Sequence, residues 1–329
     1  MIRKVGYMAA LCGLSLSPSL AVADAFEVAM LLPGQKDDGG FMEAGYRGLE
    51  RIEAELGAEI SYEDGIAPEP DALEAALRRL ADAGPDLIIA HGGQNSEAVM
   101  TVAGDYPEVL FSVTQGDVTG DNVSSYEVLQ EQSAWLAGAA SGLLTQSGVV
   151  GHISGIRVTP GLKGRGGFYH GLQHTRPDAD FLTIFAGDQD DVSLAHDVAS
   201  AQIEAGADII FTMLNAGRQG AIEAMQETEG VWQFGNVREW HEDYPEVFAG
   251  SAIANVSMAG FVAAEAVKQG RWSSGEVVRI GLENPEAVRL SLAPWVEDDI
   301  VAELDRLAGE IVEGSIEVQT SYDGEEFSL

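Results

Sequence analysis

The chain has 329 residues, of which 53 are acidic and 18 are basic, and it carries one cysteine and a formal net charge of −35. An apolar content of 46% excludes a disordered tail, and a single cysteine excludes a disulfide-stapled mini-protein. The acidity excludes a nucleic-acid binder that relies on a basic surface.

The first 23 residues predict an export signal. Arg3 and Lys4 give a positive start, residues 5–22 form an apolar run, and Ala21-Val-Ala23 ends it with small residues. This order is typical of a secretory signal, and we expect cleavage after Ala23 and a periplasmic protein. The run is short for a membrane anchor. Cys12 lies too early, and follows the wrong residue, for a lipoprotein signal. Because it lies within the predicted signal, the mature chain contains no cysteine.

Strands and helices then alternate through the first half of the chain. Apolar runs predict strands at residues 26–32, 58–62, 86–90 and 109–113. Apolar residues at helical spacing predict helices at residues 41–56, 69–83 and 94–104. Short turns between them are typical of parallel sheets that are covered by helices on both faces.

The same alternation restarts in the second half. We expect helices at residues 131–146, 164–174, 192–205 and 217–227, and strands at residues 149–153, 180–185, 208–212 and 231–234. An Ala-Gly-x-Asp step occurs in each half, beginning at Ala83 and at Ala205. Two similar halves favour two lobes, and two facing lobes of this kind bind a small molecule by hinge closure.

Several short motifs follow one another in an order that a known family shares. They are Asp37-Asp-Gly-Gly-Phe41, Ala44–Leu49, Ala103–Val109, Ala134–Gly138, Gly166-Gly-Phe168, Ala205–Ile209 and Phe234-Gly235. In this order the chain resembles the basic membrane protein (BMP) family of ABC-transporter substrate-binding proteins. No single motif is specific, but the set spans nearly the whole mature chain.

The resemblance implies an α/β fold with two Rossmann-like lobes, whose parallel sheets are joined by a three-segment hinge (the type I periplasmic-binding fold). Lobe I would comprise residues 24–125 and 252–284, and lobe II residues 126–251 and 285–329, with the last helix at 297–313. The family implies a purine nucleoside or nucleobase as ligand and an ABC permease in the inner membrane as partner. We expect a monomer that is not an enzyme and that needs no cofactor, metal or nucleic acid.

The loop after the first strand holds the first candidate ligand residues. Glycines allow close approach at Gly40, and Asp37 or Asp38 can accept hydrogen bonds from ligand hydroxyl or amino groups, unless they cap the next helix. Phe41 is either a stacking face or a core anchor. Met42 stands where the family has Asn, which exchanges a polar contact for an apolar one.

Two later loops of lobe I follow predicted strands and supply further candidates. His91, Gly92 and Gln94 match the family's glycine loop and could read the edge of a base. Gln115 and Asp117 follow the fourth strand, where the family usually carries Asp-Gly. The alternative for each side chain is a plain surface loop.

In lobe II, Gln189 stands near the place of the family's aromatic stacker, and Asn215 follows the next strand. Asn236 replaces the aspartate with which the family holds ribose hydroxyls, and Ala254 replaces a lysine. Trp240 either stacks on the ligand or packs beneath the hinge. These replacements favour a nucleobase, or another small heterocycle, over a nucleoside that is gripped through its ribose.

Other function classes have weaker support. A sugar-binding protein, or a soluble sensor of the same fold, would need the same closing cleft. An exported α/β hydrolase would need a nucleophile motif or a metal cage, and the sequence contains no G-x-S-x-G, H-E-x-x-H or P-loop pattern. The acids at 187–191 lack the glycine and terminal glutamate of a calcium loop.

Overall fold

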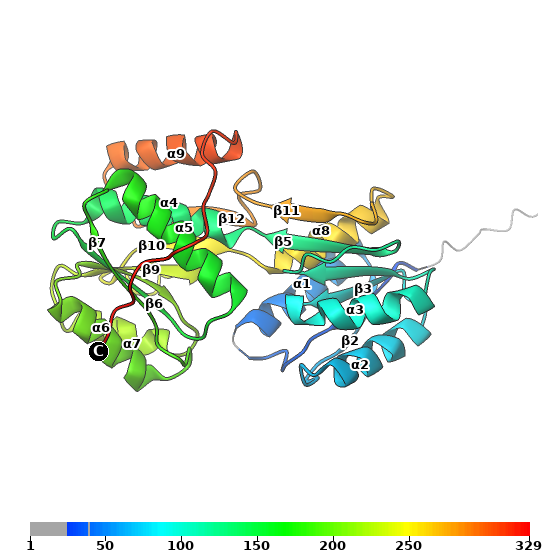
Figure 1. Cartoon of the computed structure of the whole chain (residues 1–329). Helices are drawn as coiled ribbons and strands as arrows, with labels where there is room; N and C mark the ends of the chain where they lie inside the picture. The colour runs from blue at the N-terminus through cyan, green and yellow to red at the C-terminus, as the bar shows by residue number, and fades with distance from the viewer. Residues whose placement is uncertain (1–24, 39) are drawn as a thin grey trace, which may run out of the picture.

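The computed structural model describes residues 25–38 and 40–329, so the predicted export signal and its cleavage after Ala23 lie outside the described residues. The chain forms two α/β lobes that lie side by side, each built on one six-stranded sheet (Figure 1). This confirms the predicted fold class of two lobes with mostly parallel sheets.

The sheet of lobe I has the strand order β11-β5-β4-β3-β1-β2, and all its pairings are parallel. Its strands are β1 (Glu27–Leu31), β2 (Glu59–Glu63), β3 (Leu87–His91), β4 (Leu110–Thr114), β5 (Val123–Val128) and β11 (Val277–Ile280). Its helices are α1 (Phe41–Leu56), α2 (Pro70–Asp82), α3 (Ser96–Val102) and α8 (Ser257–Lys268).

The sheet of lobe II has the order β12-β10-β9-β8-β6-β7, and β12 alone among these strands runs antiparallel to its neighbour. Its strands are β6 (Val149–Ser154), β7 (Asp180–Phe185), β8 (Ile209–Met213), β9 (Trp232–Val237), β10 (Phe248–Ala254) and β12 (Val288–Leu292). Its helices are α4 (Gln130–Leu144), α5 (Thr159–Thr175), α6 (Val192–Glu204), α7 (Arg218–Gln226) and α9 (Asp298–Val312).

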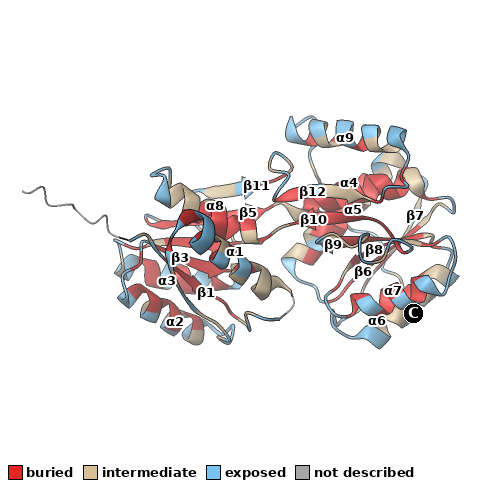
Figure 2. Cartoon of the chain, turned by 180° about the vertical axis from the view of Figure 1, so that it is seen from behind, coloured by how far each residue is buried: buried red, intermediate tan, exposed pale blue. Residues whose placement is uncertain are grey.

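Alternation along the strands explains why helices cover both faces of each sheet. In β1, Val28 and Met30 pack in the core beneath α1 and α8, whereas Ala29 and Leu31 pack beneath α2 and α3. Successive side chains of a strand point to opposite faces, so a strand that is apolar throughout must be buried on both. Figure 2 shows the result: the central strands are buried and the outer faces of most helices are exposed.

Glycines let α4 and α5 pack backbone against backbone in lobe II. An added methyl group at Gly171 would lie 1.8 Å from the carbonyl oxygen of Trp135, and one at Gly138 would lie 1.9 Å from that of Phe168. Neither distance leaves room for a side chain, so Gly138, which ends the predicted motif Ala134–Gly138, and Gly171 serve helix packing.

The chain passes between the two sheets after β5, after β10 and between β11 and β12. The predicted lobe bounds at 125/126 and 251/252 fall inside β5 and β10, and each of these strands pairs within one sheet over its whole length. We therefore propose lobe bounds after residue 128 and after residue 254. The third predicted bound, at 284/285, lies in the connection between β11 and β12.

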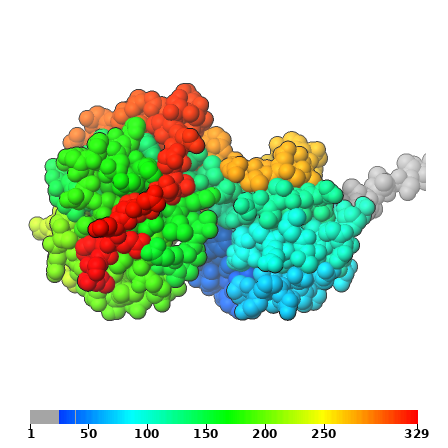
Figure 3. Space-filling view, viewed as in Figure 1, coloured from blue at the N-terminus to red at the C-terminus, as the bar shows by residue number. Residues whose placement is uncertain are grey.

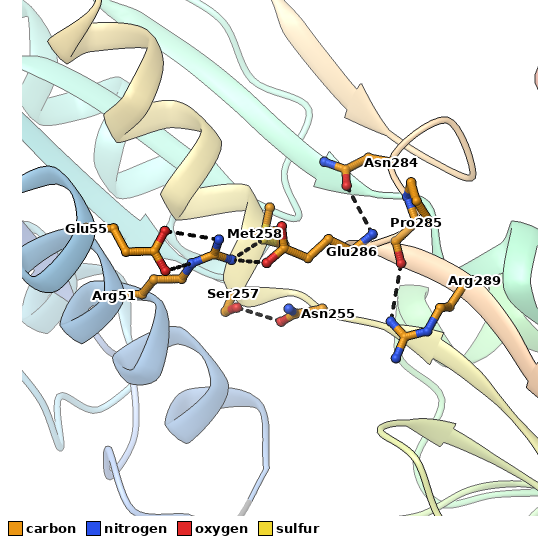
Figure 4. A network of polar contacts seen from close by, with 9 residues as sticks. All are labelled: Arg51, Glu55, Asn255, Ser257, Met258, Asn284, Pro285, Glu286 and Arg289. Carbon is orange, nitrogen blue, oxygen red and sulfur yellow. Dashed lines mark hydrogen bonds and ion pairs between the residues drawn. The ribbon is translucent and has the colours of Figure 1, made fainter.

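Ion pairs brace these connections. Lys163 of α5 in lobe II pairs with Glu127 near the end of β5 in lobe I, and Arg279 of β11 lies 3.6 Å from the same carboxylate. Figure 4 shows a second brace, in which Arg51 of α1 pairs with Glu286 in the third connection at 2.5 Å and with Glu55 at 2.8 Å. These contacts hold lobe I against the segments about which a hinge would bend.

The C-terminal segment runs across lobe II after α9, which packs on α4 (Figure 3, red). Glu326 pairs with the buried Arg165 of α5 at 2.7 Å, and Phe327 donates its backbone N–H to Thr183 of β7 at 2.8 Å. In the part of the chain that the structure covers, no helix has the length and apolar character that crossing a membrane requires.

Candidate functional site

Loops that follow the carboxyl ends of the strands bring the two lobes together. The loop between β1 and α1 meets the loop between β8 and α7, where an added methyl group at Gly40 would lie 3.6 Å from Asn215 Oδ1. In the space-filling view, residues from the start of the described chain, coloured blue, reach the surface between the two lobes (Figure 3). Open parallel sheets bind ligands at these strand ends.

Asp38 caps helix α1. Its Oδ1 accepts hydrogen bonds from the backbone N–H groups of Gly40 at 2.8 Å and Glu43 at 3.0 Å, and its Oδ2 accepts one from Met42 at 3.2 Å. These bonds satisfy amide groups that the first turn of a helix leaves free. Asp37, its neighbour, is exposed and is the more available carboxylate of the two.

Phe41 and His91 form a stacked pair in lobe I. Their ring centroids are 4.2 Å apart and their planes differ by 25°. His91 Nε2 donates to the carbonyl oxygen of Phe41 at 2.9 Å, so Nδ1 accepts from the hydroxyl of Thr114 at 3.0 Å. Burial lowers the pKa of His91 to about 4. Both ring nitrogens are therefore engaged within the protein, and His91 serves as a neutral platform for Phe41.

Glycines in the loop after β3 and in α1 lie close to His91 and its partner Thr114. Gly92 has a φ of 103°, which favours glycine, and its N–H donates to the Thr114 hydroxyl at 3.0 Å. An added methyl group at Gly45 of α1 would lie 2.6 Å from the His91 ring. The predicted residues Gln94 and Asp117 are exposed, and Met42 packs against the core of lobe I.

Gln115 contacts the protein's own backbone. Its Oε1 accepts from the N–H of Val128 at 2.6 Å, and its Nε2 donates to the carbonyl oxygen of Val128 at 3.2 Å. Val128 is the last residue of β5, directly before the chain crosses to lobe II. The side chain predicted to contact ligand thus binds the first hinge connection.

In lobe II, the loop after β7 is fastened to the loop after β8. The carbonyl oxygen of Gln189 accepts from the N–H groups of Asn215 at 2.9 Å and Gly217 at 3.1 Å. The Asn215 side chain is exposed and faces Gly40 of lobe I. This fastening places Asn215 where a ligand between the lobes would meet it.

Asn236 and Trp240 gather around an arginine that the sequence analysis did not single out. Arg218, the first residue of α7, is 4% exposed, and its Nη2 donates to Asn236 Oδ1. Its guanidinium lies 4.3 Å from the centre of the Trp240 ring, and that of Arg238 lies 3.7 Å from it. Trp240 is partly exposed and stacks on Phe248 of the lobe core, with a centroid distance of 5.9 Å.

One signal in the sequence could have pointed to Arg218. A base at the first position of a helix opposes the helix dipole, which favours acids there. Desolvation, with a smaller contribution from Arg238, lowers the pKa of Arg218 to about 9. Arg218 is therefore held in place against both the helix dipole and its own desolvation.

A hollow of about 380 Å³ lies elsewhere, at the opposite end of the lobe II sheet. It is lined by Leu143, Asp208, Trp232, Trp295 and their neighbours, and by none of the predicted ligand residues. Among the described residues, no three His, Cys, Asp or Glu side chains gather in a way that could hold a metal ion.

Two α/β lobes with three connections, and polar loops that face each other at the strand ends, define a two-lobed solute-binding protein. The chain belongs to the family described as "ABC transporter substrate-binding protein PnrA-like", whose model matches residues 25–321. This is a family of substrate-binding proteins rather than of enzymes.

Curated relatives are similar over most of their length. A purine-binding protein of Brucella abortus is 24% identical over 82% of this chain and 77% of its own, and basic membrane protein B of Borreliella burgdorferi is 25% identical over 78% and 79%. The transcriptional activator protein med of Bacillus subtilis is 24% identical over 76% and 77%.

Solved structures share the fold. A solute-binding protein of an ABC transporter system from Aeropyrum pernix K1 superposes with a TM-score of 0.74 at 20% identity, covering 89% of this chain and 92% of that one. One from Conexibacter woesei superposes with a TM-score of 0.72 at 24% identity, covering 89% and 98%.

Proposed function

We propose that this chain is the extracytoplasmic binding protein of an ABC importer, and that it binds a purine-like heterocycle between its lobes. The observation that carries the proposal is the approach of Gly40 in lobe I to Asn215 in lobe II, at the carboxyl ends of both sheets. Family membership and the purine-binding relative support the transport role and the ligand class.

Binding would proceed by hinge closure. A ligand that contacts both lobes stabilises their closed arrangement, because it binds that arrangement better than an open one. The closed form would then dock on a permease in the inner membrane, and the binding protein itself would perform no chemistry. In this proposal residues 1–23 direct export, the mature protein is periplasmic, and it acts as a monomer.

Aromatic and polar groups of both lobes would hold the ring. Phe41, partly exposed on its His91 platform, and Trp240 are the stacking candidates. Base–aromatic stacking contributes about 1–3 kcal/mol per base. The exposed Asp37 and Asn215 supply an acceptor carboxylate and an amide. A ribose-binding acid is missing at position 236, so we propose a nucleobase rather than a nucleoside.

Calorimetric titration and tryptophan fluorescence with hypoxanthine, adenine, inosine, adenosine and glucose test the proposal. We expect a nucleobase to bind and to change the emission of Trp240, which lies close to two guanidinium groups. Tighter binding of the nucleosides would overturn the nucleobase preference. Binding of glucose alone would make the chain a sugar-binding protein, and no response to any purine would contradict the purine proposal.

A further inference from the structure

Arg218 is a buried base without an acidic partner among residues 25–38 and 40–329. It is 4% exposed, and in that part of the chain no carboxylate lies within ion-pair distance of its guanidinium. Arg165, which is 6% exposed, pairs with Glu326 at 2.7 Å. Burying an arginine without a counter-charge is costly in free energy, and the 53 acidic residues of this chain could have supplied a carboxylate to pair with it. The unpaired arginine therefore indicates a partner from outside the chain.

The contacts of Arg218 fix the orientation of Asn236. A guanidinium group can only donate hydrogen bonds, so the atom of Asn236 that faces it must be the amide oxygen. The amide nitrogen consequently lies on the other side of the group. Among the described residues nothing accepts a hydrogen bond from this nitrogen, and Asn236 is partly exposed.

Arg218 keeps further donors of its own. Its Nε makes a long bond of 3.4 Å to the hydroxyl of Thr212, and its Nη2 is used by Asn236. Within the described residues, its Nη1 has no acceptor. Arg218 and Asn236 thus present donors, and no acceptors, at the carboxyl ends of β8 and β9.

An aspartate at position 236, as in the resemblance, would have the opposite polarity. It would neutralise Arg218 and offer oxygen atoms to ligand hydroxyls. The asparagine offers N–H groups instead, and it leaves the positive charge of Arg218 in place. The side of a ligand that contacts this pair must therefore carry acceptors.

We propose that Arg218 and the amide nitrogen of Asn236 bind an acceptor-only edge of the ligand, and that they select 6-oxopurines over 6-aminopurines. This specificity rests on the proposed function. Nη1 of Arg218 and the amide nitrogen of Asn236 can donate to the adjacent O6 and N7 acceptors of an oxopurine, whereas the 6-amino group of adenine is a donor that would face another donor.

The test compares hypoxanthine and adenine, two purine bases that differ in the group at C6, by calorimetric titration of the mature full-length protein. We expect hypoxanthine to bind at least about tenfold more tightly, as a pair of hydrogen bonds from Arg218 and Asn236 to one base edge implies. Equal or tighter binding of adenine overturns the specificity but leaves the purine proposal standing. Binding of neither base overturns the proposed function and this inference with it.

Asn236→Asp is the decisive variant because it is expected to fold. The new carboxylate would pair with Arg218, so the melting temperature should stay the same or rise, while the affinity for hypoxanthine falls about tenfold or more. Arg218→Met should also lose the preference for hypoxanthine, but it removes a buried side chain. Gln219→Ala, on the exposed side of the same helix, is the control and should change neither affinity. A full hypoxanthine preference in Asn236→Asp would contradict the proposal.

Discussion

The side-chain amide of Gln115 forms two hydrogen bonds with the backbone of Val128: its oxygen accepts from the N–H at 2.6 Å, and its nitrogen donates to the carbonyl oxygen at 3.2 Å. The two residues belong to neighbouring strand ends, and the chain leaves lobe I directly after Val128. Gln115 itself has a φ of 55°, which lies in the left-handed region. The pair fixes where the first hinge connection begins.

Replacing Gln115 by Ala should destabilise lobe I by about 1–2 kcal/mol, because two hydrogen bonds of ordinary strength are lost. Urea unfolding monitored by circular dichroism measures this change. Gln115→Glu keeps the acceptor for the N–H of Val128 but cannot donate to its carbonyl oxygen, so a comparable loss is expected. An alanine variant as stable as the wild type would show that these two hydrogen bonds contribute nothing to the stability of the fold.

Much of the fold was predictable because its signals are local. The helix at 41–56 was predicted with its observed bounds, since its buried residues Leu49, Ile52 and Leu56 repeat at helical spacing. Strand β5 was missed as a strand because its centre, Ser124 and Ser125, is polar. Both serines are fully buried, and their hydroxyls donate to the carbonyl oxygens of Ser273 and Val118. The residues that accept these hydrogen bonds lie at no regular spacing from the serines, so the sequence carries no periodic pattern that would predict the strand.

The candidate site was predictable as a place but less so as a set of side chains. Strand ends located the loops correctly, since Gly40 and Asn215 meet across the lobes. The sequence pattern does not show that both ring nitrogens of His91 form hydrogen bonds with Thr114 and Phe41, because the register between strands brings these groups together. Arg218 was missed because a base beside a loop looks like a solvated residue.

Gly40 offers a direct test of lobe closure. A methyl group there would lie 3.6 Å from Asn215, an ordinary contact, whereas a leucine side chain would enter the space that Asn215 occupies. We expect Gly40→Leu to fold normally but to weaken hypoxanthine binding about tenfold or more. Gly40→Ala, the matched control, should bind within a few-fold of the wild type.

Small-angle scattering of the same two variants separates closure from local damage. The wild type and Gly40→Ala should become more compact when hypoxanthine is added, and Gly40→Leu should not. If Gly40→Leu bound hypoxanthine with unchanged affinity and compacted like the wild type, the loops at Gly40 and Asn215 would not border the ligand.

Gly171→Ala should be among the more damaging single substitutions in lobe II. The new methyl group would lie 1.8 Å from the carbonyl oxygen of Trp135, so α4 and α5 must separate. Overpacking of this kind costs about 1–3 kcal/mol, and more where backbone must move. Gly309→Ala in α9 is the matched control, because nothing lies within 4 Å of the added group.

The control has its own expected sign. Alanine is favoured over glycine within a helix by about 0.5–1 kcal/mol, so Gly309→Ala should raise the melting temperature while Gly171→Ala lowers it. Thermal unfolding of both variants under one set of conditions measures the contrast. Two shifts of the same sign would contradict the close approach of α4 and α5.

Buried histidines should make the protein less stable as the pH falls. Burial lowers the pKa of His91 to about 4 and that of His152 to about 3, against an ordinary value of 6.5. Between pH 6.5 and pH 4 the unfolded chain therefore binds more protons than the folded one. The contribution of these two histidines to the free energy of unfolding is therefore largest above pH 6.5 and decreases below it, by up to about 1.4 kcal/mol per pH unit for each histidine.

His91→Gln isolates one of the two contributions. The variant should be less stable than the wild type at pH 7.5, because Gln cannot reproduce both hydrogen bonds to Thr114 and Phe41. Its stability should nevertheless fall less steeply between pH 6.5 and pH 4, since one titrating group has been removed, so the two curves approach each other as the pH is lowered. Urea unfolding at half-unit pH intervals measures both slopes. Parallel curves across this range would mean that His91 titrates alike in the folded and unfolded chains, contrary to its burial between Phe41 and Thr114.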